Sequence, residues 1–312
     1  MPASTRMNNA TSVKKGAIRE IMESMLLKMD VPYDVTPYDQ KLHDICCQRA
    51  IEQGYPMSSD RSELSLLPFI PSGVIMSATA YTHIENEATR VFIALYTAFL
   101  VYVDDVYERD NSAVRVFIER FVRGEKQLEP VLDGLAHFLP EIADHYEPVV
   151  ANIILTATLN LINASTLEFQ TQGMKASLAA KGYPKFTRQM SGSSETYALM
   201  AFPRHVPMQN YIQCLPEATM FVGYSNDVLS FYKEEMAGET VNYISVLARS
   251  KDVSNMQAFQ QLADEVARVD ASVCEILEID PEALDAWVKF KDGYVRFHTS
   301  FDRYRLDELM NI

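Results

Sequence analysis

Three carboxylates lie close together in the sequence, where Asp104, Asp105 and Glu108 form a DDxxE pattern. In a helix, Asp104 and Glu108 would share one face, because positions four apart lie one above the other. Carboxylates at this spacing suit Mg²⁺, which keeps several waters and usually bridges to substrate phosphates. The same string also arises by chance at solvated helix ends. Its position after a long apolar run favours metal binding, because carboxylates that end a buried helix are costly unless they meet water or a cation.

A second set of oxygen-bearing side chains recurs at a spacing of four residues. Asn226, Ser230 and Glu234 would place an amide, a hydroxyl and a carboxylate along one stripe of a helix. Three oxygen ligands on one rigid helix can chelate a cation, and Lys233 beside them adds a positive charge for a phosphate. The alternative is that Asn226 and Ser230 are interior polar residues bonded to the backbone. The fixed spacing favours chelation.

The elements that must position these residues are helices. The first runs from about Glu87 to the acidic cluster and is apolar on every side, which predicts a central helix surrounded by others. The second begins at Pro216, a favoured first helical position, and ends at Gly238, a favoured position just past a helix end. Sustained apolar–polar alternation of period two is absent from the sequence. The chain is therefore predicted to be all-α.

The remainder of the sequence fits one helical domain. Residues 1–16 are polar and aperiodic, and they are predicted to form a flexible N-terminal tail. Residues 17–312 are predicted to form the helical domain, whose first helix has apolar residues at helical spacing from Ala17 to Met29. The sequence contains no internal repeat and no low-complexity linker that would divide this domain.

The composition limits the partners of the chain. Its formal net charge is −14, so nucleic acid and anionic membrane surfaces would be repelled at long range. An anionic small substrate would need metal cations and local basic side chains. The four cysteines show neither a metal-binding pair nor a disulfide framework, and the N-terminus lacks an apolar signal segment. The longest apolar runs are too short for a membrane span, so we expect a cytoplasmic protein.

The string NDVLSFYKE at residues 226–234 resembles the NDxxSxxKE metal-binding motif of class I terpene cyclases. The residues of this string, including Phe and Tyr before the lysine, are similar to those of the trichodiene synthase-like family of fungal sesquiterpene synthases. The resemblance covers residues from about 91 to 306, with four motifs in the family's order. The acidic motif ends in Glu108 where this family has Asp, a change within the range of the wider family.

Two further segments carry the resemblance. Residues 183–192 are similar to the family's segment with a diphosphate-sensing arginine, which makes Arg188 the sensor. Residues 302–306 resemble a basic segment whose Arg–Tyr pair binds diphosphate in the closed state, and Arg303 and Tyr304 take those roles. This second segment has one arginine fewer before the tyrosine than the family's pattern.

The resemblance implies a single-domain class I terpenoid synthase helical bundle with a central active-site cavity. It implies a carbon–oxygen lyase acting on phosphates that ionises farnesyl diphosphate and cyclises the carbocation to a sesquiterpene hydrocarbon or alcohol. The implied cofactor is Mg²⁺, with three ions and with Mn²⁺ as a substitute. The implied metal ligands are Asp104, Asp105, Glu108, Asn226, Ser230 and Glu234. The implied diphosphate-binding residues are Arg188, Lys233, Arg303 and Tyr304. The implied catalytic residues are Asp104, Arg188, Asn226, Ser230, Glu234, Arg303 and Tyr304.

Several alternatives stay open. The substrate could be geranyl or geranylgeranyl diphosphate, because packed side chains set the depth of the pocket. A chain-elongating prenyltransferase would be expected to carry a second aspartate-rich motif where residues 226–230 stand, and a non-catalytic isoprenoid-binding protein would be expected to have lost part of the metal set. Homodimers occur among the relatives. Aromatic rings that could line an apolar wall and steer a carbocation are Phe69, Tyr81, Tyr96, Phe99, Phe186 and Trp287.

Overall fold

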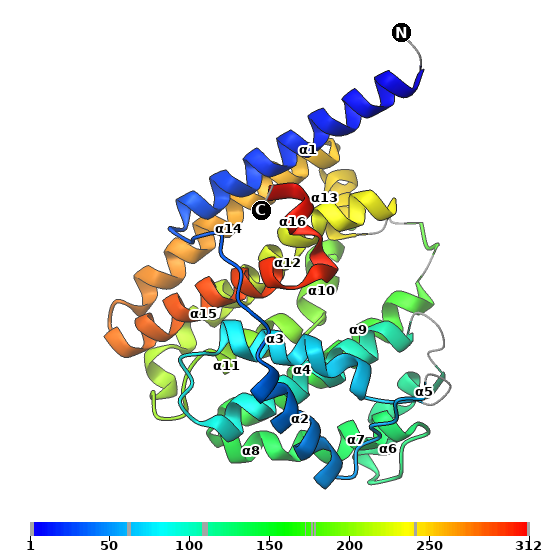
Figure 1. Ribbon diagram of the computed structural model, residues 1–312, viewed down its shortest axis with the longest axis vertical. Coiled ribbons are helices and arrows are strands. Elements are labelled where there is room, and N and C mark those ends of the chain that lie inside the picture. The colour runs from blue at the N-terminus through cyan, green and yellow to red at the C-terminus, as the bar shows by residue number, and fades with distance from the viewer. Residues whose placement is uncertain are drawn as a thin grey trace.

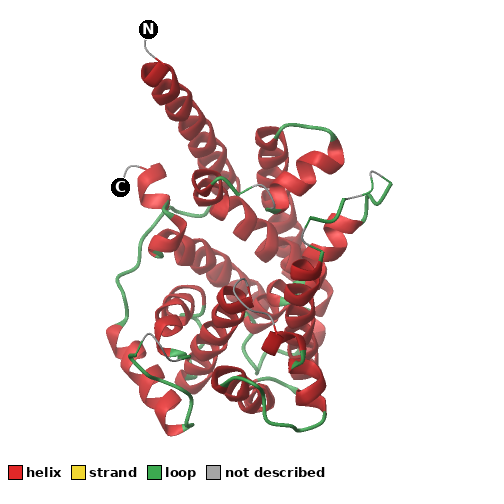
Figure 2. Ribbon diagram, turned by 90° about the vertical axis from the view of Figure 1, so that its right-hand side faces the viewer, coloured by secondary structure: helices red, strands yellow, loops and turns green. Residues whose placement is uncertain are grey.

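A computed structural model describes residues 3–60, 64–107, 112–171, 173–175, 177, 179–239 and 242–310. The regular secondary structure in these ranges is entirely helical, which confirms the predicted all-α class (Figure 2). The longer helices are α1 (Ala3–Lys28), α2 (Gln40–Glu52), α3 (Ile70–Ala80), α4 (Glu87–Tyr107), α9 (Pro148–Gln170), α12 (Leu215–Ala237), α14 (Asn255–Leu277) and α15 (Pro281–Ser300).

Short helices connect and cover the long ones. The short α-helices are α5 (Ser112–Arg115), α6 (Phe117–Val122), α7 (Pro130–Phe138), α8 (Ile142–His145), α10 (Tyr183–Met190), α11 (Ser193–Met200), α13 (Tyr243–Lys251) and α16 (Leu306–Met310). The 3₁₀ segments are η1 (Leu67–Phe69), η2 (Leu139–Glu141), η3 (Met208–Asn210), η4 (Ile212–Cys214) and η5 (Asp302–Tyr304).

Helix α4 lies in the middle of the bundle, as its sequence predicts (Figure 1). It packs against α2, α3, α7 and α9. Ile93, Ala94, Leu95 and Tyr96 are successive residues, each turned by about 100° from the one before, and all four are buried. A helix that is apolar all round needs neighbours on every side, and α4 has them. Its acidic C-terminal end therefore emerges from the core at a defined place.

The second predicted helix corresponds to α12, which packs between α11, α14 and α15. It begins beside Pro216 and ends at Gly238, whose φ of 73° is left-handed. Glycine adopts this conformation without the steric cost that a Cβ atom brings. Both predicted ends of this helix are confirmed. Consequently the polar stripe at residues 226–234 lies on one continuous helix.

Helix α1 begins earlier than the sequence analysis predicts. The expected start is Ala17, whereas the helix begins at Ala3 and includes most of the segment expected to be a tail. Residues 3–15 contain neither proline nor glycine, so nothing in their composition ends a helix. The N-terminal end of α1 extends beyond the other helices (Figure 1). Among residues 14–28 of this helix, the first buried side chain is Ile18, where the apolar stripe begins. The division of the chain at residue 16 stays a prediction.

A sharp break separates α10 from α11 and sets the position of Arg188. Gly192 stands at the break with a φ of 64°, a conformation that favours glycine. A Cβ atom at Gly192 would lie only 1.9 Å from the carbonyl oxygen of Ala157 in α9. Glycine is therefore required here both for the turn and for the close packing of α9.

Helix α9 is the one helix among the described residues that is long and apolar enough to cross a membrane by length and composition. It packs against α4, α10 and α11 within the bundle. In its middle, Thr158 Oγ1 lies 2.7 Å from the hydroxyl of Tyr96 in α4, at a fully buried position. A helix that packs within a bundle can pass the same composition test, and 39% of this apolar window is buried against its neighbours.

Candidate active site

The acidic motif lies at the C-terminal end of α4, facing η5. The Asp104 side chain is 67% exposed and the Asp105 side chain 34% exposed. The guanidinium of Arg303 contacts both, with Nη2 3.3 Å from Asp105 Oδ1 and 3.9 Å from Asp104 Oδ2. The third member of the predicted motif, Glu108, lies outside the described residues. A positive group therefore already stands beside two of the predicted metal ligands.

The polar stripe of α12 is partly enclosed. Ser230 is buried, and its hydroxyl donates a hydrogen bond of 2.6 Å to Glu234 Oε1. Burial raises the pKa of Glu234, because removal from water disfavours the charged carboxylate. A divalent cation would offset that cost, and the available donors are oxygens of the type that Mg²⁺ prefers. The residues present therefore fit Mg²⁺.

Asn226, the first member of the stripe, contacts the C-terminal part of the chain. Its amide nitrogen lies 3.2 Å from His298 Nε2 and donates to the Tyr304 hydroxyl at 3.4 Å. Burial lowers the pKa of His298 to about 3, so the imidazole is neutral at pH 7. The ring of Tyr304 also lies 5.4 Å from Lys233 Nζ, within the range of a cation–π contact. The structure thus brings Asn226, Lys233 and Tyr304 together as neighbours.

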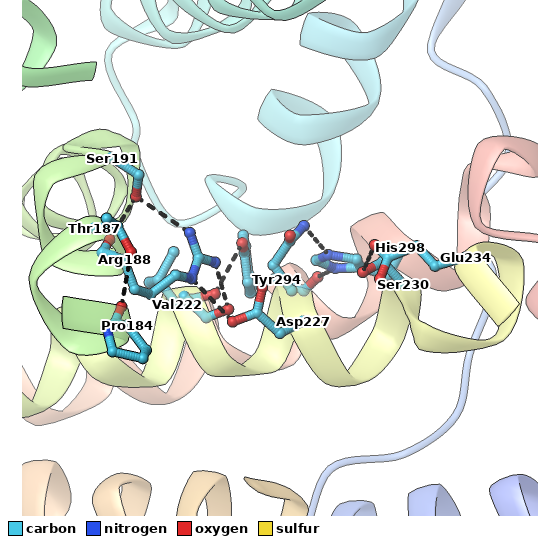
Figure 3. A network of polar contacts seen from close by, with 12 residues as sticks. Pro184, Thr187, Arg188, Ser191, Val222, Asp227, Ser230, Glu234, Tyr294 and His298 are labelled. Atoms are coloured by element: carbon cyan, nitrogen blue, oxygen red, sulfur yellow. Dashed lines mark hydrogen bonds and ion pairs between the residues drawn. The ribbon is translucent and has the colours of Figure 1, made fainter. Parts of the chain in front are cut away.

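Arg188 reaches from α10 onto the side of α12 (Figure 3). Its Nε donates to Asp227 Oδ2 at 2.9 Å, its Nη2 to the Gly223 carbonyl at 2.6 Å, and its Nη1 to Ser191 Oγ at 3.1 Å. Gly223 leaves room for this approach, since a Cβ atom there would lie 3.3 Å from the guanidinium. Burial alone would lower the Arg188 pKa, but the charge of Asp227 offsets burial and raises it. Arg188 is therefore held charged in a fixed orientation.

Asp227→Asn is expected to destabilise the protein by about 3 kcal/mol, because it leaves the buried Arg188 guanidinium without its counter-charge. Asp285→Asn is the control, since it breaks an ion pair with Lys289 that is more than half exposed and is expected to cost less than about 1 kcal/mol. Urea unfolding of the two variants and the unaltered chain measures both values. Equal costs at the two positions would show that the Arg188 pair is not a buried, stabilising contact.

Three residues that hold the predicted site residues in place were not predicted from the sequence. These are Gly223 and Asp227, which bind Arg188, and His298, which binds Asn226. A signal for the first two was present, because a glycine inside a helix and an aspartate beside buried apolar residues call for a specific contact. For His298 the partner is 72 positions away in the sequence, and no local pattern indicates it.

The aromatic residues expected to line an apolar wall differ in burial. Phe69 is partly buried and packs against Tyr102. Tyr81, Tyr96 and Phe99 are completely buried in the bundle. Phe186 is 51% exposed on α10, so the structure does not place it in an interior wall. Trp287 is also buried, but its indole nitrogen donates to Asp270 of α14 at 3.0 Å. Its contacts are those of a core residue.

A cleft of about 770 Å³ lies away from the predicted metal-binding and diphosphate-binding residues that the structure describes. It runs between α2 and the first half of α4, with Val91, Phe92 and Leu95 among its apolar lining residues. Asp104 and Asp105 stand at the opposite end of α4. The described predicted site residues do not line this cleft.

Comparison with known proteins gives one consistent result. The sequence model of the trichodiene synthase family matches residues 70–312. Alpha-cuprenene synthase of Coprinopsis cinerea is 39% identical over 311 residues, which cover 100% of this chain and 95% of that protein. Monoterpene synthase 25 of Postia placenta is 35% identical over 252 residues, which cover 80% of this chain and 76% of that protein.

The fold has a counterpart among solved structures. The crystal structure of linalool/nerolidol synthase from Streptomyces clavuligerus in complex with 2-fluorogeranyl diphosphate superposes with a TM-score of 0.63. The match covers 86% of this chain and 96% of that chain, at 14% sequence identity. At this identity the likeness concerns the fold, and it identifies the class I terpenoid synthase bundle.

Proposed function

This chain belongs to the trichodiene synthase family of terpene cyclases, and from this we propose that it ionises farnesyl diphosphate with Mg²⁺ and cyclises the resulting carbocation to a sesquiterpene. The observation that carries the proposal is the position of two adjacent residues in η5. Arg303 contacts Asp105 at the end of α4, and Tyr304 contacts Asn226 on α12. One short segment thus joins the acidic motif to the polar stripe.

The reaction begins with heterolysis of the bond between the first carbon of the isoprenoid and the diphosphate oxygen. The electron pair leaves with the diphosphate, and an allyl cation stays behind. Mg²⁺, when bound, supplies positive charge that stabilises the charge accumulating on the leaving group. The residues proposed to hold it are Asp104, Asp105 and Glu108 on one side and Asn226, Ser230 and Glu234 on the other.

Three basic side chains are proposed to bind the diphosphate directly. Arg188 is fixed on α12 by Asp227, so its guanidinium needs little reorganisation to meet an anion. Arg303 contacts two carboxylates and would contact phosphate oxygens once these carboxylates bind cations. Lys233 adds a compact charge beside Tyr304. Together they would hold the leaving group away from the cation.

The carbocation would require surroundings that exclude water and offer electron-rich aromatic faces to a positive intermediate. Tyr81, Tyr96 and Phe99 are the buried candidates, and the proposal requires that they border the bound substrate. The reaction ends when the final cation loses a proton to give a hydrocarbon or captures water to give an alcohol. We propose that the enzyme works in the cytoplasm without a membrane span, with a homodimer as the assembly to be tested.

Geranyl diphosphate is the alternative substrate that a specific observation favours. One relative with 35% identity is named a monoterpene synthase, which keeps the shorter substrate in consideration. Purified protein would be incubated separately with geranyl, farnesyl and geranylgeranyl diphosphate in the presence of Mg²⁺, and volatile products would be identified by mass spectrometry. Cyclic products mainly from farnesyl diphosphate support the proposal. Cyclic products from only geranyl or only geranylgeranyl diphosphate would show that this compound, and not farnesyl diphosphate, is the substrate. Binding without diphosphate release would favour a non-catalytic protein.

Arg303→Lys is expected to slow turnover about tenfold and to raise the fraction of acyclic and alcohol products. Lysine keeps the positive charge but loses the planar fork that matches carboxylate and phosphate oxygens. A looser hold on the diphosphate would admit other cation conformers and water. Product ratios from gas chromatography measure the effect, and Arg305→Lys, whose arginine pairs with Glu308, is the control. Slower turnover with an unchanged product spectrum would show that this arginine does not couple closure to cyclisation.

A further inference from the structure

Asn226 can serve a metal only through one of its two terminal atoms. Its Oδ1 oxygen has lone pairs, whereas its Nδ2 nitrogen is a donor and cannot ligate Mg²⁺. Rotation of the amide by half a turn exchanges these two atoms. A functional metal site therefore needs something that fixes which atom faces the metal.

His298, on the last turn of α15, contacts the amide and is fully enclosed in the protein. Its Nδ1 lies 2.8 Å from the carbonyl oxygen of Tyr294 in the preceding turn (Figure 3). A carbonyl oxygen only accepts hydrogen bonds, so Nδ1 must carry the ring hydrogen. The ring is enclosed among Tyr294, Phe297 and Tyr304, where an uncompensated charge would be costly, so it is in its neutral form and Nε2 is an acceptor.

This tautomer determines the orientation of Asn226. The Nε2 acceptor lies 3.2 Å from Asn226 Nδ2, so the amide nitrogen is the atom that must face His298. The Tyr304 hydroxyl also accepts from Nδ2, at 3.4 Å. In a planar amide the oxygen lies opposite the nitrogen. Asn226 Oδ1 is consequently directed away from both partners.

We propose that His298 is a positioning residue that turns the Asn226 amide so that its oxygen faces the divalent metal. The inference rests on the proposed function, because it assigns the role of a residue behind the polar stripe of α12. It adds a carbonyl–imidazole–amide chain that runs from Tyr294 through His298 to Asn226. Groups that orient metal ligands in this way commonly change metal affinity 10- to 100-fold when they are replaced.

Two substitutions of His298 differ mainly in reach and therefore test the role. His298→Asn can bond to the Tyr294 carbonyl but is too short to reach Asn226, so it is expected to weaken Mn²⁺ binding at least about tenfold. His298→Gln extends an oxygen acceptor towards Asn226 and is expected to stay within about threefold of the unaltered chain. Mn²⁺ binding in the presence of inorganic diphosphate is measured by electron paramagnetic resonance, with no turnover required. Trp287→Phe, which alters a buried residue of α15 that bonds to Asp270, is the control and is expected to leave the Mn²⁺ affinity unchanged.

The same substitution in an Asn226→Asp background separates orientation from general damage. Aspartate has oxygen at both terminal positions, so His298→Asn should change its Mn²⁺ affinity by less than about twofold, as the orientation no longer matters. Three outcomes would overturn the inference. The loss of Mn²⁺ affinity could be equal in both backgrounds, His298→Asn could leave Mn²⁺ binding unchanged in the chain with Asn226, or both His298 variants could fail to fold. If the unaltered chain bound no Mn²⁺ with diphosphate, the proposed function would fail as well. If the unaltered chain bound Mn²⁺ and His298→Asn bound it with the same affinity, only the inference about His298 would be overturned, and the proposed function would stand.

Discussion

Glu234→Gln is expected to lower kcat/KM by about 100-fold or more, whereas Glu235→Gln is expected to stay within about threefold. Both changes remove one carboxylate charge from the same turn of α12. Glu234 returns to the face of Asn226 and accepts a hydrogen bond from Ser230. Glu235 is rotated by about 100° around the helix and pairs with Lys14 of α1. Steady-state kinetics over a range of Mg²⁺ concentrations measures both variants, and equal losses would contradict the position of the stripe.

The stability of the Glu234→Gln variant shows whether Glu234 acts in catalysis or in folding. Burial raises the pKa of Glu234 above its value in the unfolded chain, so the protonated form is favoured by folding. This contribution to stability is present below the unfolded pKa and is lost as the pH rises through the folded pKa. At pH 7 the metal-free Glu234→Gln protein is therefore expected to unfold at the same temperature as the unaltered chain or higher. A lower unfolding temperature would assign Glu234 a structural role.

Arg188→Lys is expected to lower kcat/KM by about 100-fold, the second largest effect of a single substitution. Lysine keeps the charge, but a single ammonium cannot make the three contacts to Asp227, Gly223 and Ser191 in their present geometry. The side chain would lose its fixed orientation towards the diphosphate. Inhibition by inorganic diphosphate should weaken in parallel with turnover.

A matched control for Arg188→Lys is Arg268→Lys. Arg268 also pairs with a carboxylate, Glu265, but its side chain is 59% exposed, and its replacement is expected to change kcat/KM less than twofold. If Arg188→Lys kept the unaltered affinity for inorganic diphosphate, Arg188 would be a structural residue only.

The long helices at the site could be predicted because their signals are local. The start and end of α12 follow from Pro216 and Gly238, and the central position of α4 follows from apolar residues on all of its sides. The predicted start of α1 at Ala17 was wrong, because a lack of apolar periodicity does not by itself end a helix. Apolar periodicity indicates which residues pack against the core, and in residues 14–28 of α1 the first buried side chain is Ile18.

The contacts within the site were harder to predict, because they join residues far apart in sequence. Motif spacing places Asn226, Ser230 and Glu234 on one face, and α12 carries them there. The bonds from Arg188 to Gly223 and from His298 to Asn226 depend on how α10 and α15 cross α12. Helix crossing is set by packing over many side chains, and no short sequence pattern encodes it.

The measurement that tests the account most directly is release of diphosphate together with product analysis, with farnesyl diphosphate as substrate, in Mg²⁺ and after removal of metal by a chelator. The carboxylates of the site and the diphosphate repel one another without a cation between them. We therefore predict cyclic sesquiterpene products with Mg²⁺, a loss of at least about 100-fold in rate after chelation, and recovery when Mg²⁺ or Mn²⁺ is restored. Diphosphate release at the full rate in chelator-treated protein would contradict the account.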